Sequence, residues 1–433
     1  MRLYSTKTKS HKVSLAEAVM RGLPPDNGLY MPERLPRLPR AFLDNLDRYS
    51  FPEIAYTVSR TLIDEELSDT DLRRIIDAAV TFPAPLVRLD DRRHVLELFH
   101  GPSLAFKDFG ARFMAQLMGH FNRHNDEELT ILVATSGDTG GAVAAGFYRT
   151  PGIRVVILYP SGKVSALQEK QLTTLGHNIS ALEIDGTFDD CQALVKRAFL
   201  DRELNDRKRL SSANSINIAR LIPQSFYYFE GYKQLGDKGT PAAFCIPSGN
   251  FGNLTAGLIA RRMGLPIEHL IAATNANDVV PVYLASGQYK PRPSVRTLSN
   301  AMDVGAPSNF ARLMDMFGST WNQVKSIIHG YAYADQRTES AMREVAERYD
   351  YTIDPHGAVG YLALEDYLRS YPSHQGVILE TAHPAKFLTD VERVLNKSIK
   401  VPPRLASLAD KKKVSTPLPV DYQQFRGYLL SNG

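Results

Sequence analysis

The chain has 433 residues, of which 43% are hydrophobic and 23% are charged, a composition typical of a globular protein with two or three domains. The formal net charge of +4 is small and dispersed, which argues against nucleic acid as a partner. No segment has the apolar length of a membrane span, no apolar targeting region opens the chain, and the two cysteines have no metal-ligand spacing. We therefore expect a cytoplasmic protein, in a reducing compartment, with neither membrane nor nucleic acid as a partner.

Apolar runs rich in branched residues alternate with helix-like segments after residue 90. Strands are predicted at 94–99, 129–135, 153–159, 179–184, 242–247 and 269–274. Helices are predicted at 107–122, 139–149, 164–175, 188–204, 217–234 and 253–263. This alternation is typical of α/β architecture with largely parallel sheets.

The two ends of the chain follow different patterns. The first part is rich in proline between Pro24 and Pro52 and then becomes helical, so we expect residues 1–90 to form a separate N-terminal domain. The last 30 residues are expected to form an extended tail over the surface.

Lys107 lies in an unusual stretch, HGPSLAFKDFG at residues 100–110, between Phe106 and Phe109. It follows a predicted strand and opens a predicted helix. Aromatic neighbours would desolvate the ammonium, lower its pKa and free the amine as a nucleophile that can form a Schiff base with an aldehyde. The alternative is a snorkelling surface lysine paired with Asp108, and this motif alone does not decide between the two.

Two further strand-to-helix junctions are rich in Gly, Ser and Asn. The first, PSGNFGN at 247–253, offers backbone N–H groups, a helix N-terminus and side-chain donors, which together could hold a phosphate. The second, TSGDTGGAV at 135–143, contains Asp138, which would repel a dianion, so a singly charged carboxylate is the better guest. Each could instead be an ordinary capped turn. Two anion seats and one desolvated lysine indicate pyridoxal phosphate (PLP) with an amino acid substrate.

Eight blocks of the chain, in order, resemble one family. They are HGPSLAFKDFG, TSGDTGGAV, YPSGKVSALQEKQ (159–171), SSANSINIARLIPQ (211–224), PSGNFGN, LSNAMDVGAPSNFAR (298–312), DPHGAVG (354–360) and TAHPAKF (381–387). Together they resemble the threonine synthase family of fold-type-II PLP enzymes, in its longer bacterial and fungal form. Similarity in the N-terminal stretch extends the resemblance over nearly the whole chain.

The resemblance implies a fold similar to the β-subunit of tryptophan synthase. That fold has two open, twisted, mostly parallel sheets flanked by helices, here joined to an N-terminal domain. The limits we expect are 1–90 for the N-terminal domain, 91–125 with 210–433 for a large PLP-binding domain, and 126–209 for a smaller substrate-side domain. A monomer or a homodimer is expected.

The resemblance also implies roles for single residues. Lys107 would form the Schiff base and later act as acid and base at the substrate's carbons. Thr381 would face the pyridine nitrogen, and Asp138 would lie near the cofactor's 3′-oxygen. The cofactor phosphate would be held by Gly249, Asn250, Phe251, Gly252 and Asn253. The substrate carboxylate would be held by Thr135, Ser136 and Thr139. The substrate phosphate would be held by Ser161, Lys163, Asn214, Ser215, Asn217 and Arg220.

The implied enzyme is a carbon–oxygen lyase acting on a phosphate. It would convert O-phospho-L-homoserine and water to L-threonine and phosphate, the last step of threonine biosynthesis, by γ-elimination and β-hydration. One alternative is a phospholyase or dehydratase of the same fold that forms a 2-oxo acid, against which Lys163 and the 211–220 block argue, because a dehydratase needs no phosphate clamp. The other is a non-catalytic homologue, against which the intact lysine and phosphate loop argue.

Two side-chain assignments have competing interpretations. Glu380 precedes Thr381 and could meet the ring nitrogen instead, but successive strand residues point to opposite faces, so we expect the threonine to do so. His100, His356 and His383 all fall in motif blocks and could in principle bind a metal. They share no local ligand spacing, so we expect hydrogen-bonded structural histidines and no metal.

Overall fold

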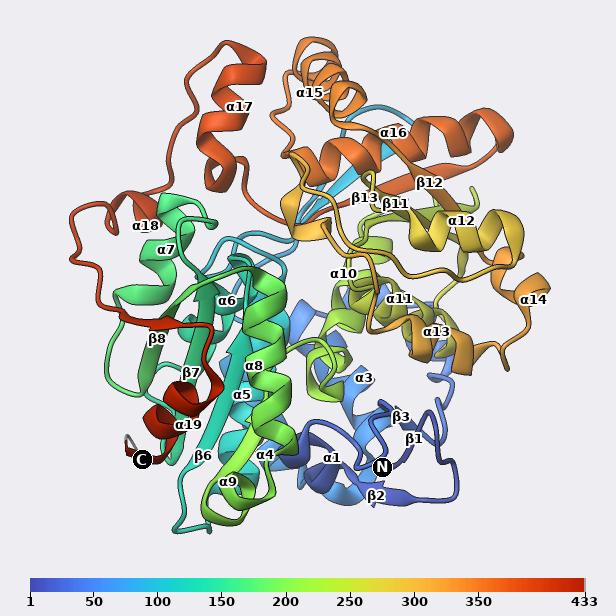
Figure 1. Ribbon diagram of the computed structural model, residues 1–433. Helices are drawn as coiled ribbons and strands as arrows, with labels where there is room; N and C mark the ends of the chain where they lie inside the picture. The colour runs from blue at the N-terminus through green and yellow to red at the C-terminus, as the bar shows by residue number, and fades with distance from the viewer. Residues whose placement is uncertain (432–433) are drawn as a thin grey trace.

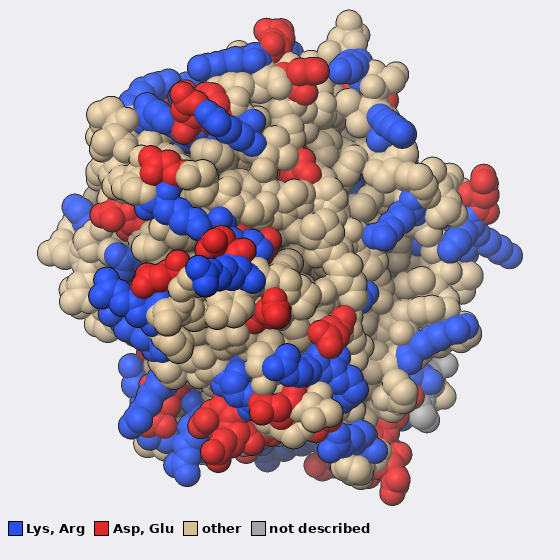
Figure 2. Space-filling view, turned by 180° about the vertical axis from the view of Figure 1, so that it is seen from behind, with Lys and Arg blue, Asp and Glu red and all other residues tan. Residues whose placement is uncertain are grey.

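The computed structural model describes residues 1–431 of the chain and consists of two helix-flanked sheets preceded by a smaller N-terminal unit (Figure 1). The predicted α/β fold with two mostly parallel sheets and an N-terminal domain is confirmed. On the face seen from behind, Lys and Arg side chains are interspersed with Asp and Glu side chains, and neither sign dominates (Figure 2).

The larger sheet has six strands in the order β12-β11-β10-β13-β5-β4, and only β4 runs antiparallel to its neighbour. Its strands are β12 (Ile328–Ala332), β11 (Ile267–Thr274), β10 (Ala242–Pro247), β13 (Gln375–Glu380), β5 (Arg93–Glu97) and β4 (Leu86–Arg88). The central strands β10 and β13 are buried along their whole length, as expected for a parallel sheet that helices cover on both faces.

The smaller sheet has five parallel strands in the order β14-β8-β7-β6-β9. Its strands are β14 (Thr416–Pro419), β8 (Ile179–Asp185), β7 (Ile153–Pro160), β6 (Leu129–Ala134) and β9 (Arg209–Ser212). The domain limits expected from the sequence stay a prediction. The structure adds that β9 and β14, from distant parts of the chain, both belong to this smaller sheet.

The N-terminal unit contains a small antiparallel sheet in the order β2-β1-β3, from Arg2–Ser5 (β1), Lys12–Ser14 (β2) and Tyr30–Pro32 (β3). Its helices are α1 (Leu15–Arg21), α2 (Arg40–Leu43), α3 (Phe51–Ile63) and α4 (Asp69–Ala79). Phe51 of α3 and Phe82 contact Phe109, with ring centroids 5.6 and 4.5 Å away. This unit therefore shares its core with the helix that Lys107 begins.

Helices cover both sheets. They are α5 (Lys107–Asn122), α6 (Asp138–Phe147), α7 (Ala166–Thr173), α8 (Phe188–Leu200), α9 (Arg202–Arg207), α10 (Phe226–Lys233), α11 (Gly252–Arg262), α12 (Val279–Ser286), α13 (Phe310–Met316), α14 (Trp321–Lys325), α15 (Asp335–Tyr349), α16 (Pro355–Ser370), α17 (Leu388–Leu395), α18 (Pro403–Ala406) and α19 (Tyr422–Ser431). The predicted helix 188–204 is split because Asp201 caps a new helix, its carboxylate accepting the Leu204 N–H at 3.0 Å. The predicted helix 217–234 begins instead with two short 3₁₀ turns.

The C-terminal segment is not an extended tail, and that expectation is wrong. Residues 416–419 form β14, which pairs in parallel with β8, and α19 buries Phe425 against the core of the smaller sheet. Lys413 bridges Glu169 and Glu183 at 2.6 and 2.7 Å, and this fixes the entry to the strand. Burial of α19 and strand pairing thus fold the segment onto the smaller sheet.

Candidate active site

Lys107 is positioned by a loop that crosses from β5 to the end of β13. The Leu98 N–H donates to the Glu380 carbonyl at 3.0 Å, and the Phe106 N–H donates to the Thr381 carbonyl at 2.8 Å. Leu104, within the loop, has a left-handed backbone (φ 57°), which helps the chain to reverse before α5 begins. These bonds fix Lys107 at the N-terminus of α5, beside Thr381.

The Lys107 amine is desolvated, as the sequence predicted. The side chain is half-buried, and its Nζ lies 5.9 Å from the centroid of the Phe106 ring. Burial lowers the pKa of Lys107 to about 8; Asp138 opposes this shift, and the cations Lys386 and Arg220 reinforce it. A sizeable neutral fraction of this lysine therefore exists near neutral pH.

Asp108 is not a surface partner of Lys107. Its carboxylate turns inward and accepts the Ser103 N–H at 2.8 Å, while its second oxygen has no partner among residues 1–431. Burial raises the pKa of Asp108 to about 6. The alternative of a solvated Lys107–Asp108 pair does not describe this site.

Asp138 and Lys386 form a buried ion pair next to Lys107. The Lys386 ammonium lies 2.7 Å from Asp138 Oδ1 and also donates to the Ser103 carbonyl at 2.7 Å, while Gln168 donates its amide N–H to the same Asp138 oxygen at 2.9 Å. Burial would raise the pKa of Asp138, but Lys386 and Lys107 outweigh it and hold the pKa well below its usual range. Sequence reasoning missed Lys386, although it lies inside the TAHPAKF block.

The 135–139 loop is a tight turn with free hydroxyl groups. Thr135 Oγ1 accepts the N–H groups of Gly137 and Gly140 at 3.0 and 2.9 Å, so its main task is to shape the turn. Within the described part of the chain, the hydroxyls of Ser136 and Thr139 make no hydrogen bond to protein. The loop can therefore offer these two hydroxyls to a carboxylate.

The 249–253 loop leads from β10 into α11. Phe251 is left-handed (φ 60°), and the helix begins at Gly252. Asn250 Oδ1 accepts from the N–H and the hydroxyl of Ser308, both at 3.3 Å. Asn253 Oδ1 accepts from two tyrosine hydroxyls, whereas its buried Nδ2 has no partner among the described residues. The Asn253 amide group can thus donate to a ligand beside the N-terminus of α11.

The two glycines of this loop differ in what packing requires of them. A Cβ on Gly249 would lie 2.9 Å from both the Ala301 carbonyl oxygen and the Met302 Cα, so close packing against backbone excludes a side chain there. A Cβ on Gly252 would come no nearer than 3.4 Å to any protein atom, which is ordinary contact. Protein packing alone does not require glycine at position 252, so the space beside it is open to the close approach of a bound group.

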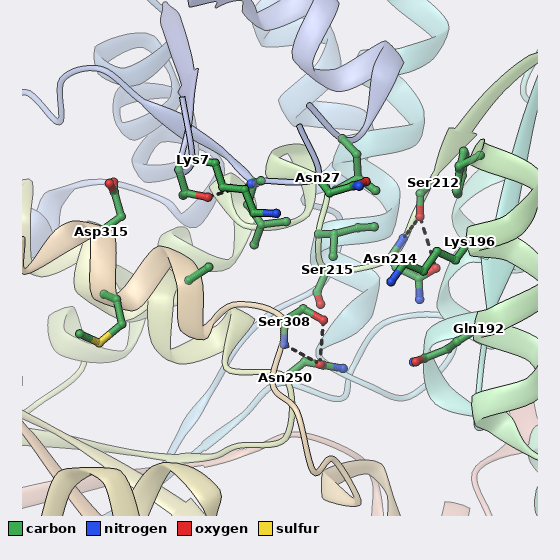
Figure 3. Close-up of a pocket in the computed structure, with 18 of the residues that line it drawn as sticks. Lys7, Asn27, Gln192, Lys196, Ser212, Asn214, Ser215, Asn250, Ser308 and Asp315 are labelled. Carbon is green, nitrogen blue, oxygen red and sulfur yellow. Dashed lines mark hydrogen bonds between the residues drawn. The ribbon is translucent and has the colours of Figure 1, made fainter. Parts of the chain in front are cut away.

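A cavity of about 720 Å³ opens beside these loops. It is lined by Ala134, Asn214, Ser215, Asn250 and Ser308, by Gln192 and Lys196 of α8, and by Lys7 and Asn27 of the N-terminal unit. Figure 3 shows Asn250 and Ser308 on the opposite side from Lys7 and Asn27. The cavity therefore joins parts of all three units, although Lys107 itself is not in its lining.

Only some of the residues expected to hold the substrate phosphate come together here. Asn214 and Ser215 line the cavity. Asn217 is fully buried, and its side-chain amide donates to the Val19 and Ser212 carbonyls, so it shapes the segment. Lys163 is exposed and donates to the Gly186 carbonyl at 2.9 Å, and Ser161 donates to Glu183, so both lie outside the cavity lining.

Arg220 is a buried cation without a carboxylate partner among residues 1–431. Its Nη1 donates to the Ala213 carbonyl at 2.6 Å, and its Nε has no partner in that part of the chain. Burial lowers the pKa of Arg220 to about 10, although Asp108 counteracts this. A buried guanidinium in this state favours a nearby anionic guest.

Thr381 and the three motif histidines have well-defined surroundings. Thr381 is buried at the end of β13, whereas the Glu380 carboxyl turns toward α16 and accepts the Asp354 N–H at 2.7 Å. His100 bonds to Glu97 at 2.7 Å, His383 accepts the Ala385 N–H at 3.0 Å, and His356 bonds to Asp354. The prediction of hydrogen-bonded histidines is confirmed, and Thr381 as the partner of the ring nitrogen stays a prediction.

These residues fit a phosphate-bearing aldehyde. They provide a partly neutral lysine, a glycine-containing loop with space at Gly252, and donors on Asn253 and Arg220 that have no partner within residues 1–431. Three family models cover the chain: "Threonine synthase N terminus" at residues 2–80, "Pyridoxal-phosphate dependent enzyme" at 81–379, and "Threonine synthase, C-terminal" at 357–429. The chain belongs to the threonine synthase family.

Relatives support this membership over the full length. The chain is 47% identical to threonine synthase of Serratia marcescens over 99% of both chains, and 46% identical to that of Escherichia coli K12 over all of both. The crystal structure of threonine synthase from Escherichia coli matches the whole chain with 46% identity and a TM-score of 0.94, and all of the matched chain is covered. The crystal structure of PLP-bound threonine synthase from Brucella melitensis matches the whole chain with 35% identity and a TM-score of 0.93, and 99% of the matched chain is covered. The chain is therefore a PLP-dependent lyase of this family. Among residues 1–431 no helix is long and apolar enough to cross a bilayer.

Proposed function

We propose that the protein converts O-phospho-L-homoserine and water to L-threonine and phosphate. The observation that carries this proposal is the Lys107 amine, which burial keeps partly neutral, together with the free hydroxyls of the 135–139 loop and a buried Arg220 guanidinium that has no carboxylate partner among residues 1–431. Such a site suits a substrate with a carboxylate at one end and a phosphate at the other. Full-length similarity to named threonine synthases supports the choice.

In this proposal four groups of this chain would hold the cofactor. Lys107 would bond its aldehyde carbon, the 249–253 loop would bind its phosphate, Thr381 would face the ring nitrogen and Asp138 would lie near the 3′-oxygen. Bound PLP supplies an electron sink that acidifies the carbon-bound protons of the amino acid. Because a threonine hydroxyl is neutral, it would leave the ring nitrogen largely unprotonated.

The protein's own groups then have separate tasks. Ser136 and Thr139 donate to the substrate carboxylate. Arg220, Asn214 and Ser215 bind the substrate phosphate, with Ser161 and Lys163 farther away, just after the end of β7. Lys107 removes the α-proton and later returns one, because a lysine with a pKa of about 8 can be either base or acid near neutral pH.

Product analysis tests the proposal. Purified protein with PLP is incubated with O-phospho-L-homoserine, and L-threonine, phosphate and 2-oxobutanoate are quantified. Equal amounts of threonine and phosphate are expected, and Lys107→Ala should abolish both while the protein stays folded. Arg112→Ala, on the same helix but turned toward the carbonyls of Ala78 and Ala79, is the control and should retain activity. Stoichiometric 2-oxobutanoate would favour the dehydratase alternative instead.

Location and assembly complete the proposal. Both cysteines, Cys191 and Cys245, are buried and free, which supports the proposed cytoplasmic location in a reducing compartment. A monomer or homodimer is proposed, together with the division into residues 1–90, 91–125 with 210–433, and 126–209, except that β9, β14 and α19 pack with the smaller sheet.

A further inference from the structure

A short turn forms the wall behind the cofactor-phosphate loop. It is the 3₁₀ turn Asn300–Met302, whose Ala301 carbonyl oxygen and Met302 Cα lie so near Gly249 that a Cβ there would be only 2.9 Å from either atom. Backbone packed this closely cannot shift by a few tenths of an ångström without moving its neighbour. The position of this turn therefore sets the position of the loop.

His356 holds the turn in place. The Ala301 N–H donates to His356 Nε2 at 3.2 Å, and the ring is buried, with 2% of its surface exposed. A ring nitrogen accepts only when it carries no proton, so these partners assign the imidazole proton to Nδ1. Nδ1 in turn donates to Asp354 Oδ2 at 2.6 Å.

Asp354 connects His356 by hydrogen bonds to α16 and to Glu380 at the end of β13. Its second carboxylate oxygen caps α16 by accepting the Gly357 N–H at 2.7 Å, and its own N–H donates to Glu380 at 2.7 Å. Burial, followed by the Asp354 charge, raises the pKa of Glu380 well above its usual range. Glu380 immediately precedes Thr381, so one buried network connects the phosphate-loop wall to the end of β13.

The rest of the turn is anchored from elsewhere. Asp303 accepts from Thr297 Oγ1 at 2.7 Å and from Asn275 Nδ2 at 2.9 Å, and these bonds fix the residues on either side of the turn. Within residues 1–431, His356 provides the only side-chain acceptor for the Ala301 N–H.

We propose that His356 is a positioning residue for the cofactor phosphate, acting through Ala301 on Gly249 of the phosphate loop. This role depends on Nε2, the ring nitrogen that accepts the Ala301 N–H. Losing it leaves the partly buried Ala301 N–H without its protein acceptor, and the turn then relaxes away from the loop. This inference depends on PLP binding at the 249–253 loop and does not depend on which amino acid is the substrate.

Two substitutions separate the acceptor from the rest of the ring. His356→Gln places a carboxamide oxygen near the position of Nε2 and can still accept from Ala301, whereas His356→Asn reaches only the position of Nδ1 and can still donate to Asp354. Both are polar and smaller than histidine, so each is the other's control. Apoprotein is titrated with PLP to obtain Kd, and hydrogen exchange is followed in peptides covering 297–304.

His356→Asn should weaken PLP binding about fivefold to tenfold, the effect of losing this hydrogen bond, whereas His356→Gln should stay within about threefold of wild type. The ³¹P resonance of the bound cofactor should move only in His356→Asn, and exchange at 297–304 should speed up in the same variant. Equal Kd values in all three proteins, or equal losses in both variants, would overturn the proposal.

If His356→Asn does not fold, Ala301→Pro removes the same N–H while the His356–Asp354 pair stays intact. The same fivefold or greater loss of PLP affinity is then expected, and unchanged affinity would overturn the proposal. Because all of these measurements use binding and not turnover, an error in the assigned reaction would leave them unaffected.

Discussion

Removal of the Lys386 charge perturbs the most deeply buried ion pair near Lys107. In Lys386→Met the side chain keeps its length and apolar stem but loses the ammonium that lies 2.7 Å from Asp138. The side chains of Lys386 and Asp138 are 1% and 4% exposed, so water cannot replace the lost partner. Gln168 then remains as the neutral donor to the Asp138 carboxylate.

Two effects of known direction follow. Leaving one member of a buried pair unpaired costs about 3–5 kcal/mol of unfolding free energy. In addition, the repulsion that Lys386 exerts on Lys107 disappears while the attraction to Asp138 stays, so the pKa of Lys107 rises from about 8. A rise of about one unit would reduce the neutral fraction at pH 8 from about a half to about a tenth, so cofactor capture would slow about fivefold.

The assay is the rate at which apoprotein takes up PLP between pH 6.5 and 9.5, with denaturant unfolding measured alongside. Lys386→Met should shift the midpoint of the pH–rate curve upward and unfold at lower denaturant. The double variant Lys386→Met/Asp138→Asn removes both charges and should regain much of the stability, with the midpoint moving back down. A midpoint unchanged in the single variant, or a double variant no more stable than the single one, would refute the reasoning.

Three further outcomes are expected. Gly252→Ala should leave the melting temperature of the apoprotein unchanged and weaken PLP binding more than tenfold, while Gly249→Ala should lower both; equal behaviour would contradict the packing difference. In Asp108→Asn the stability gain over wild type should grow by about 2–3 kcal/mol between pH 4 and pH 7, because the folded protein binds this proton up to about pH 6 and the unfolded chain releases it earlier; a pH-independent gain would be inconsistent with that. Lys163→Met should keep PLP affinity and lower kcat/KM for O-phospho-L-homoserine by no more than about fivefold, because an exposed lysine makes only a screened phosphate contact; a loss of tenfold or more confined to phosphorylated substrate would instead place Lys163 in the clamp.

Local pattern was enough to predict β5, β6 and β10, which lead into the three glycine-containing junctions, and the helix that begins at Lys107. The signal of these strands is a short apolar run followed by such a junction. The sequence analysis did not predict β13, the strand that ends beside Thr381. The same local signal failed for residues 416–419, because Pro417 and Pro419 argue against a strand. The structure accommodates them because β14 is at the edge of its sheet, where one side of the strand needs no ladder partner.

The partners of the candidate site residues could not be read from the sequence. Lys386 meets Asp138 across 248 positions of chain, and nothing local to TAHPAKF indicates whether its lysine faces solvent or a carboxylate. Asn217 lies in a block whose polar residues all resembled phosphate ligands, yet its side-chain amide donates to the backbone carbonyls of Val19 and Ser212. Spacing identifies which residues converge on a site, whereas tertiary packing decides which of them still have a free donor.

The three cations considered for the substrate phosphate differ in whether they still have a free donor. The charge of Lys386 is already neutralised by Asp138, so Lys386 affects the pKa of Lys107 but attracts a dianion only weakly. Lys163 is in solvent, where a phosphate contact is screened and weak. Arg220 is buried; in the part of the chain that the structure describes, its side chain bonds to a backbone carbonyl and its Nε has no partner. A buried guanidinium in this state costs folding free energy unless an anion binds it, so of these three cations we propose Arg220 for the substrate phosphate.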